Sequence, residues 1–187
     1  MNPFHWLKEL WRLRAVEREL ESAVRSGKRE LESAIRSGNT AEVERIAASL
    51  PNVLHVPLNK RGDTALFLAL FPPCPRAAEV VGILIKHGAN VNARDGLGTP
   101  LQYALAPLCA SAATLVSVDP LVRSEMLSEV ALTVAVLIKS GADVNAPESF
   151  LGKPLKMLPA TKDCTDAVMV KVVETVRSML LKKGARD

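Results

Sequence analysis

The hydrophobic positions of this chain recur at intervals of three and four residues, which is the spacing of amphipathic α-helices. The pattern is clearest in two apolar runs, "VVGILIKHG" and "LTVAVLIKSG", which end at Gly88 and Gly141. A glycine after such a run supplies the left-handed residue that commonly ends a helix. The pattern therefore predicts an all-α chain whose helices are separated by short turns.

The segments that follow these glycines are rich in Asn, Asp and Gly, which favour turns. Thr64 and Thr99 then stand where helix N-caps are expected. Pro100 and Pro154 stand where the first residue of a helix tolerates proline. The order of these residues predicts that each turn leads directly into a new helix.

Near the amino terminus, "ELESAVRSGKR" (19–29) is followed at once by a near copy, "ELESAIRSGNT" (30–40). A right-handed coiled coil built on an eleven-residue period needs many copies, and only two are present. Each copy also carries a glycine, which costs about 1 kcal/mol inside a helix. We therefore expect one helix to end near Gly27, a second over 30–37, a turn at Gly38 and Asn39, and a third helix over about 40–50.

These features resemble the ankyrin repeat, a β-turn followed by two antiparallel helices with a T-P-L-H-x-A signature. The resemblance covers residues 30–187 and implies an ankyrin-type α-solenoid of about four helix-turn-helix repeats, with short β-turn fingers. The expected repeats span about 30–58, 59–92, 93–145 and 146–187. Residues 1–29 would form an N-terminal amphipathic helical cap, because terminal repeats need a cover for their exposed core.

The chain departs from the family pattern in two ways. The third position after the threonine, usually His, holds Phe67, Gln102 and Lys156, and Lys153 replaces the threonine itself in the last unit. Extra residues also stand between the two helices of a repeat, after a short first helix. Asp119 and Thr165 could cap second helices that start early, so the second helices of repeats 3 and 4 should be extended. The inserted stretch "ASAATLVSV" (110–118), just before Asp119, is small and apolar and should be packed.

Composition narrows the function. A formal charge of +4 and a pI near 9.1 are mildly basic, but acids are interspersed among the bases, which argues against nucleic acid as a partner. No apolar run has the length of a signal peptide or a membrane span, so we expect a cytoplasmic protein. The three cysteines, Cys74, Cys109 and Cys164, are far apart and should be buried, unreactive thiols with no bound metal.

The sequence contains no catalytic motif, and its three histidines lie in three different predicted elements. His87, just before Gly88, is best placed to interact with the end of its helix. We therefore expect no enzyme and no cofactor. A less favoured alternative is an enzyme with a pocket lined by the inserted segment 107–125, where the polar candidates are Ser111, Ser117, Asp119 and Arg123.

The resemblance implies a non-catalytic scaffold that binds a partner protein through its concave face and fingers. An inhibitor or immunity-type protein of bacteria is a narrower version of this function, and the isolated chain is expected to be a monomer. Leu97 and Phe150 are the best candidate anchors, unless Phe150 packs onto the neighbouring finger. The candidate partner-binding residues are Asn59, Lys60, Arg61, Asp63, Phe67, Asn92, Arg94, Asp95, Leu97, Gln102, Tyr103, Asn145, Glu148, Ser149, Phe150 and Lys156.

The first residues concentrate both tryptophans of the chain, in "NPFHWLKELWRL". Three roles remain open for this helix, which carries Phe4, Trp6 and Trp11. It could cap the first repeat, anchor a partner protein through its aromatic side chains, or lie on a membrane surface with its basic residues beside the headgroups. The latter two roles would make the chain an adaptor associated with a membrane or an enzyme.

Overall fold

The computed structural model describes residues 5–70, 74–114, 119–164 and 167–186, without the side chains of residues 5–13, 15–17, 20 and 110–114. Within these ranges the chain forms α-helices and no β-strand, so the predicted all-α class is confirmed. The α-helices are α1 (His5–Ser37), α2 (Thr40–Ser49), α3 (Ala65–Leu70), α4 (Ala77–Lys86), α5 (Pro100–Thr114), α6 (Pro120–Lys139) and α7 (Ala167–Lys182). A short 3₁₀ helix, η1 (Pro51–His55), follows α2, and another, η3 (Thr161–Asp163), precedes α7.

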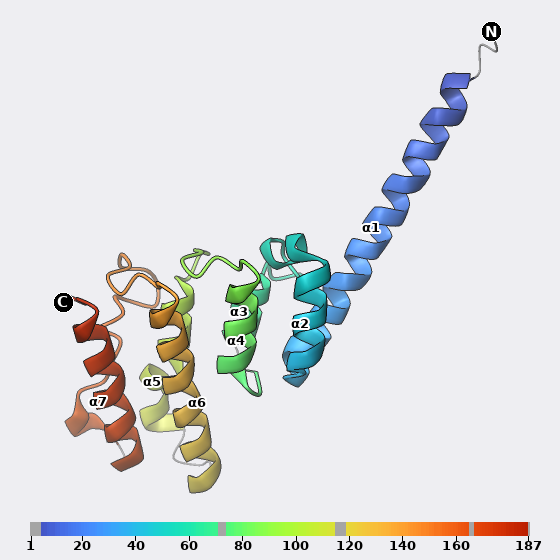
Figure 1. The fold of residues 1–187 in the computed structure, drawn as a ribbon. Helices are drawn as coiled ribbons and strands as arrows, with labels where there is room; N and C mark the ends of the chain where they lie inside the picture. The colour runs from blue at the N-terminus through green and yellow to red at the C-terminus, as the bar shows by residue number, and fades with distance from the viewer. Residues whose placement is uncertain (1–4, 71–73, 115–118, 165–166, 187) are drawn as a thin grey trace.

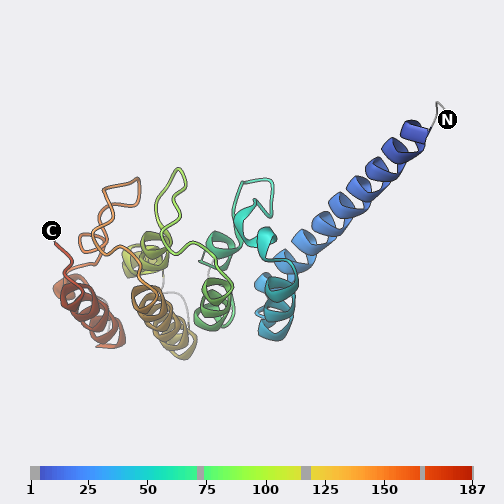
Figure 2. The same cartoon turned by 45° about the horizontal axis from the view of Figure 1, so that its top comes forward.

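The helices stack side by side in two rows (Figure 1). One row contains the end of α1, then α3 and α5, and the other contains α2, α4, α6 and α7. The helices also pair across the rows, α1 with α2, α3 with α4 and α5 with α6. Figure 2 shows that the long turns between successive pairs project on the same side of the stack. This arrangement leaves one edge of the molecule lined by turns.

Several of the predicted helix ends are observed. Gly88 and Gly141 adopt φ values of +99° and +90°, the left-handed conformation that glycine accepts without strain. Asn39 caps α2, since its side chain accepts a hydrogen bond from the backbone N–H of Glu42 at 3.2 Å. The side chain of Asp119 caps α6 in the same way, accepting from Leu121 N–H at 2.9 Å. Local sequence signals therefore place these boundaries correctly.

The predicted helix end near Gly27 is wrong, because α1 runs unbroken from His5 to Ser37. Gly27 is buried, and a β-carbon on it would lie 2.6 Å from Cδ1 of Leu50. The glycine thus permits close packing rather than a helix end. Figure 1 also shows the first part of α1 pointing away from the other helices, so it does not fold back over the first pair as a cap would.

The inserted residues are distributed differently from the prediction in the third unit. Its first helix, α5, is not short but continues for 15 residues, through Pro107 and Cys109. The second helices α6 and α7 are extended as predicted, with 20 and 16 residues. Thr165, the predicted cap of α7, lies outside the described residues, as do residues 115–118 and the side chains of 110–114 in the stretch predicted to be packed.

The last unit has turns where its first helix was expected, over residues 154–158. One helix-like hydrogen bond remains, from Met157 N–H to the carbonyl of Lys153 at 3.0 Å. Lys153 occupies the position of the capping threonine, and lysine has no side-chain oxygen to accept a hydrogen bond from the first N–H groups of a helix. The missing cap thus accords with the turns that stand here in place of a helix.

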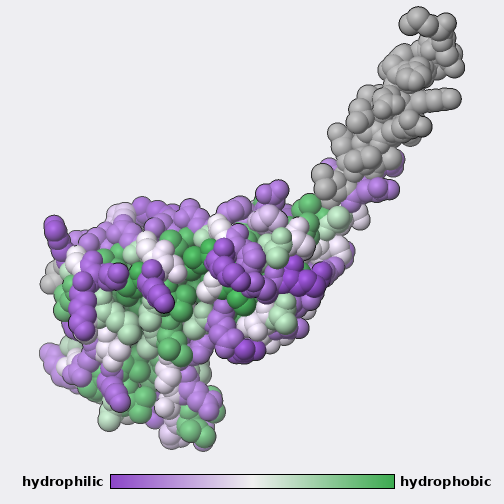
Figure 3. Space-filling view, in the orientation of Figure 1, coloured by the Kyte–Doolittle hydropathy of each residue, from purple (hydrophilic) through white to green (hydrophobic). Residues whose placement is uncertain are grey.

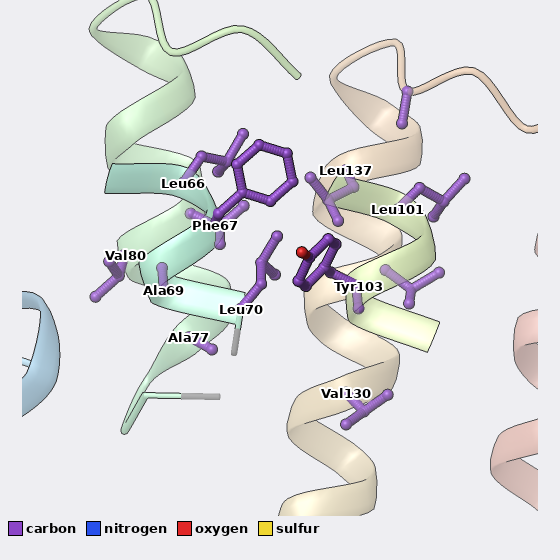
Figure 4. Packing of buried hydrophobic residues seen from close by; sticks show 14 of the residues in the cluster. Leu66, Phe67, Ala69, Leu70, Ala77, Val80, Leu101, Tyr103, Val130 and Leu137 are labelled. Atoms are coloured by element: carbon purple, nitrogen blue, oxygen red, sulfur yellow. The ribbon is translucent and has the colours of Figure 1, made fainter. Parts of the chain in front are cut away.

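Between the rows lies a continuous apolar core, part of which is drawn in Figure 4. All six residues of α3 are buried, so this short helix is enclosed by its neighbours rather than amphipathic. Leu101 of α5 and Leu137 of α6 are 1% and 0% exposed. Burial of one leucine side chain contributes about 1.5–3 kcal/mol. The core fixes the positions of the helices from which the turns project.

Candidate protein-binding surface

Three long turns, here called fingers, form the edge of the stack: finger 1 (59–63), finger 2 (90–98) and finger 3 (143–152). In finger 1, the Asn59 side chain accepts hydrogen bonds from the backbone N–H groups of Arg61 and Asp63, at 2.9 and 3.1 Å. Its amide also donates to the Asp63 carboxylate at 2.7 Å. Asn59 and Asp63 therefore hold the turn, whereas Lys60 and Arg61 are exposed on it.

Finger 2 is organised by Asp95. One carboxylate oxygen accepts hydrogen bonds from the backbone N–H groups of Leu97 and Gly98 at 2.8 and 2.9 Å, and the other accepts from the hydroxyl of Tyr103. Burial, together with the hydrogen bond to this carboxylate, raises the pKa of Tyr103. The phenol therefore stays protonated and donates to Asp95 at physiological pH.

Phe67 and Tyr103 were predicted to face the partner, and this prediction is wrong. Their side chains are only 4% and 5% exposed, and their rings pack against each other with centroids 5.0 Å apart at an angle of 60°. Figure 4 shows the two rings between α3 and α5. Such tilted aromatic pairs stabilise a core beyond their area. The two residues join neighbouring helix pairs instead of meeting a ligand.

Gln102 was also predicted to face the partner, but it is fully buried. Its side-chain oxygen accepts from the N–H and the hydroxyl of Thr99 at 2.8 and 3.1 Å, while Thr99 Oγ1 accepts from Gln102 N–H at 3.4 Å. This is a capping box at the start of α5. The Gln102 amide also donates to the carbonyls of Pro147 and Gly152 in finger 3. Gln102 thus fastens finger 3 to α5.

Asn92 and Asn145 have a structural role in place of the predicted partner contact. The Asn92 side chain donates to the carbonyl of Gly141 at 3.0 Å and accepts from Asp143 N–H at 2.8 Å. Asn145 makes the same pair of bonds with the backbone after α7, at 2.9 and 2.8 Å. Each asparagine therefore links one finger to the next helix end. The repeated tripeptide Val-Asn-Ala at 91–93 and 144–146 was the sequence signal for this equivalence.

Leu97 and Phe150 remain as apolar residues at finger tips, with 44% and 85% of their surface exposed. Phe150 therefore does not pack onto the neighbouring finger. The two tips are joined by a backbone hydrogen bond from Leu151 N–H to the carbonyl of Leu97, at 3.4 Å, and Ser149 Oγ accepts from the same N–H at 3.2 Å. Fingers 2 and 3 thus present two neighbouring apolar side chains to solvent.

The other predicted residues with exposed side chains are polar. We call them, together with the two apolar tips, the finger surface: Lys60, Arg61, Arg94, Leu97, Glu148, Phe150 and Lys156. Ser149 and Asp95 belong to the same turns but use their side-chain oxygens to hold them. Three further predicted residues, Asn92, Asp95 and Asn145, are also exposed, but their side chains are bonded to backbone groups of the fingers and helix ends.

The face formed by the second helices has a different character. Figure 3 shows apolar residues visible over α6 and α7, and polar residues where α1 and α2 meet the stack. Leu132 of α6 is 57% exposed on this flank. Where α2 meets α4, Glu44 accepts hydrogen bonds from Lys86 at 2.7 Å and lies 3.0 Å from Nε2 of His87. His87 thus contacts the neighbouring helix through its side chain, while its backbone N–H caps its own helix end by donating to the carbonyl of Ile83 at 3.1 Å.

The cysteines differ from the prediction of three buried thiols. Cys74 is buried, which raises its pKa to about 11, but Cys109 is exposed and Cys164 is half-buried. The thiol of Cys109 nevertheless donates to the carbonyl of Met157 at 2.6 Å, and desolvation raises its pKa. In the described part of the chain, no group of three or more His, Cys, Asp or Glu side chains could hold a metal ion.

The residues proposed for an alternative enzymatic pocket are described only in part. Asp119 is committed to the N-cap of α6, and Ser117 and the side chain of Ser111 lie outside the described residues. A groove between α1 and finger 1 lies elsewhere and measures about 610 Å³. It is lined by Glu32, Arg36, Leu58, Asn59, Lys60 and Arg61.

Comparison with known proteins gives one match. A family model described as Ankyrin repeat matches residues 61–96, which comprise the end of finger 1, α3, α4 and most of finger 2. The resemblance drawn from the sequence is thereby confirmed for residues 61–96. No curated protein matches the chain. Among the described residues, no helix is both long and apolar enough to span a membrane.

Proposed function

From the premise that residues 61–96 form an ankyrin repeat, we propose that this chain is a non-catalytic scaffold that binds a partner protein through the finger surface. Ankyrin repeats commonly mediate protein–protein interaction. The proposal takes the partner to lie across the fingers and to contact successive repeats at once. Binding would then require no conformational change of the fingers, because hydrogen bonds within each finger already hold it in shape.

The observation that carries this proposal is the pair of exposed apolar side chains on adjacent fingers. Phe150 is 85% exposed, and the next residue, Leu151, donates a backbone hydrogen bond to the carbonyl of Leu97, which is 44% exposed. Apolar anchors of this kind contribute much of the binding energy in protein interfaces. Charged residues on the same edge, among them Arg94, Glu148 and Lys156, provide the polar rim that surrounds such anchors.

The narrower form of the proposal is an inhibitor or immunity-type protein. A preformed row of fingers can cover a surface of its target without any chemistry of its own, and it loses little conformational entropy on binding. The same proposal places the chain in the cytoplasm as a monomer that acts by occupying its partner. This form rests on analogy with the function of other scaffolds.

A second candidate function uses α1, because this helix extends beyond the stack (Figure 1). In this alternative the tryptophan-rich start of the chain, with Phe4, Trp6 and Trp11, joins the scaffold to a membrane surface or to an enzyme. Phe4 and the side chains of both tryptophans lie outside the described residues. Liposome sedimentation with and without residues 1–18 tests the membrane form, and absence of lipid binding by the full chain rules it out.

The main proposal is tested by quantitative affinity capture from a source lysate with three forms of the protein. The test variant combines Leu97→Ala and Phe150→Ala, and the control is Leu132→Ala, which removes an exposed apolar side chain from α6. A partner of the finger surface should be depleted by the double substitution and retained by the control. Equal recovery of every captured protein by all three forms would contradict the proposal.

A further inference from the structure

Five arginines lie along one side of α1: Arg14, Arg18, Arg25, Arg29 and Arg36. Their spacings of four and seven residues keep them on one face of a helix with 3.6 residues per turn. All five side chains are exposed. The buried side of the same helix carries Gly27, Leu31 and Ala34, about half a turn away. We call the five residues the arginine stripe.

The stripe leads into the groove between α1 and finger 1. Arg36, its last member, lines this groove together with Lys60 and Arg61 of the finger. Leu58, which is 8% exposed, forms an apolar part of the groove wall. A helix face and a finger that are distant in the sequence therefore combine into one basic, partly apolar surface, and the groove within it measures about 610 Å³.

The charges of this surface are unbalanced. Glu32 forms an ion pair with Arg36 at 3.0 Å, and Asp63 forms one with Arg61 at 3.3 Å. Each of these carboxylates is therefore already paired with one basic side chain. Among the side chains that the structure describes, Arg25, Arg29 and Lys60 form no ion pair. By contrast, finger 3 carries acids, Asp143 and Glu148. Lys153, Lys156 and Arg186 lie beside these acids, so finger 3 is of mixed charge and the row of arginines lies at the α1 end of the finger edge.

We infer that the arginine stripe and the groove bind an acidic segment of the partner protein, which fixes the direction in which the partner lies across the fingers. This inference rests on the proposed function, because it names the chemistry of one end of that partner. A guanidinium group matches a carboxylate in geometry and can donate two parallel hydrogen bonds to it. The acidic end would lie at α1, and the apolar contacts would lie at Leu97 and Phe150.

Discrete carboxylates suit this surface better than a phosphate backbone does. The stripe is interrupted by Glu21 and Glu32 on the same side of α1, and these would repel the evenly spaced charges of a nucleic acid. A flexible peptide can place its acids opposite individual arginines and its neutral residues opposite the glutamates. From Arg25 to Arg36 the helix rises about 16 Å. Roughly five residues of extended peptide span that length.

The test uses fluorescence anisotropy at low ionic strength, with a labelled ten-residue peptide of alternating Glu and Ala as the probe. A peptide with Gln in place of Glu and a ten-nucleotide single-stranded DNA are the comparison probes. The test variant is Arg29→Glu with Lys60→Glu. The control, Lys182→Glu with Lys183→Glu, makes the same change in net charge at the far end of the stack. Phe150→Ala completes the set, because the inference assigns Phe150 no contact with the acidic segment.

The expected result is that the Glu peptide binds the wild-type chain more tightly than both comparison probes. Reversal at Arg29 and Lys60 should weaken its binding at least about tenfold, while the control reversal changes it less than about twofold and Phe150→Ala leaves it unchanged. Equal weakening by both reversals would show a general effect of net charge and overturn the inference. Tighter binding of DNA than of the Glu peptide would also overturn it. Either failure would leave the proposed role of Leu97 and Phe150 standing, since that role is tested by capture.

Discussion

Replacing Gln102 should destabilise the fold far more than its polar character suggests. In Gln102→Met the side chain keeps its length, but the N–H of Thr99 and the carbonyl of Gly152 lose their partner. At about 1 kcal/mol for each buried polar group left unpaired, the expected loss is about 2 kcal/mol. Gln102→Ala also leaves a cavity at a fully buried position, which adds about 2 kcal/mol and brings the expected loss to about 4 kcal/mol.

The assay is urea unfolding followed by circular dichroism, with the free energy of unfolding obtained from the midpoint and slope. Lys156→Met is the matched control, because Lys156 holds the equivalent motif position in the next unit but is exposed. It should change the free energy of unfolding by less than about 0.5 kcal/mol. A loss below 1 kcal/mol in both Gln102 variants would refute the reasoning that Gln102 fastens finger 3 to α5.

Three further predictions concern other contacts. Asn92→Ala should lower the free energy of unfolding by about 1–2 kcal/mol, measured by the same urea titration, because two backbone groups of the next helix end lose their partner. The pKa of Glu44 is lowered, chiefly by the hydrogen bond from the side chain of Lys86 and secondly by that from His87. The contribution of Glu44 to stability is therefore present above its pKa in the unfolded chain and is lost as the pH falls through its lower pKa in the folded chain. Thermal melts between pH 3 and 7 should therefore show a smaller loss of Tm on acidification in Glu44→Gln than in the wild type. In the native protein at pH 8, a thiol reagent should modify Cys109 faster than Cys74. Burial raises the pKa of both thiols, but Cys109 lies at an exposed residue, whereas Cys74, whose pKa is about 11, should react only after unfolding; equal rates would contradict the burial of Cys74.

The helix boundaries that the sequence predicts correctly depend on interactions within a few residues. Gly88 ends a helix because it accepts a left-handed backbone, and Asp119 begins one because its carboxylate reaches the next N–H groups. Both signals are complete within one turn of chain. The break predicted at Gly27 fails because the decisive contact is with Leu50, which the local sequence does not reveal.

The candidate site is predicted less well for the same reason. Exposed tips such as Phe150 follow from their position in a turn, but the roles of Gln102 and Asn92 depend on backbone groups more than forty residues away. A polar residue at a motif position can equally meet a ligand or a neighbouring repeat. Tyr103 is hard to predict for a second reason, because its two contacts lie in different units. Its hydroxyl donates to Asp95 in the same unit, and its ring packs against Phe67 in the previous unit.

The central claim is that a partner protein lies directly on the finger surface. The most direct measurement is site-specific photo-crosslinking in cells, with a benzophenone amino acid replacing Phe150 in one form and Leu132 in another. Both side chains are exposed, Phe150 to 85% and Leu132 to 57%, so a probe at either position can react with a protein that lies beside it. We predict a discrete crosslinked product of defined mass from position 150 and none from position 132. The same product from both positions, or a product only from position 132, would contradict the account.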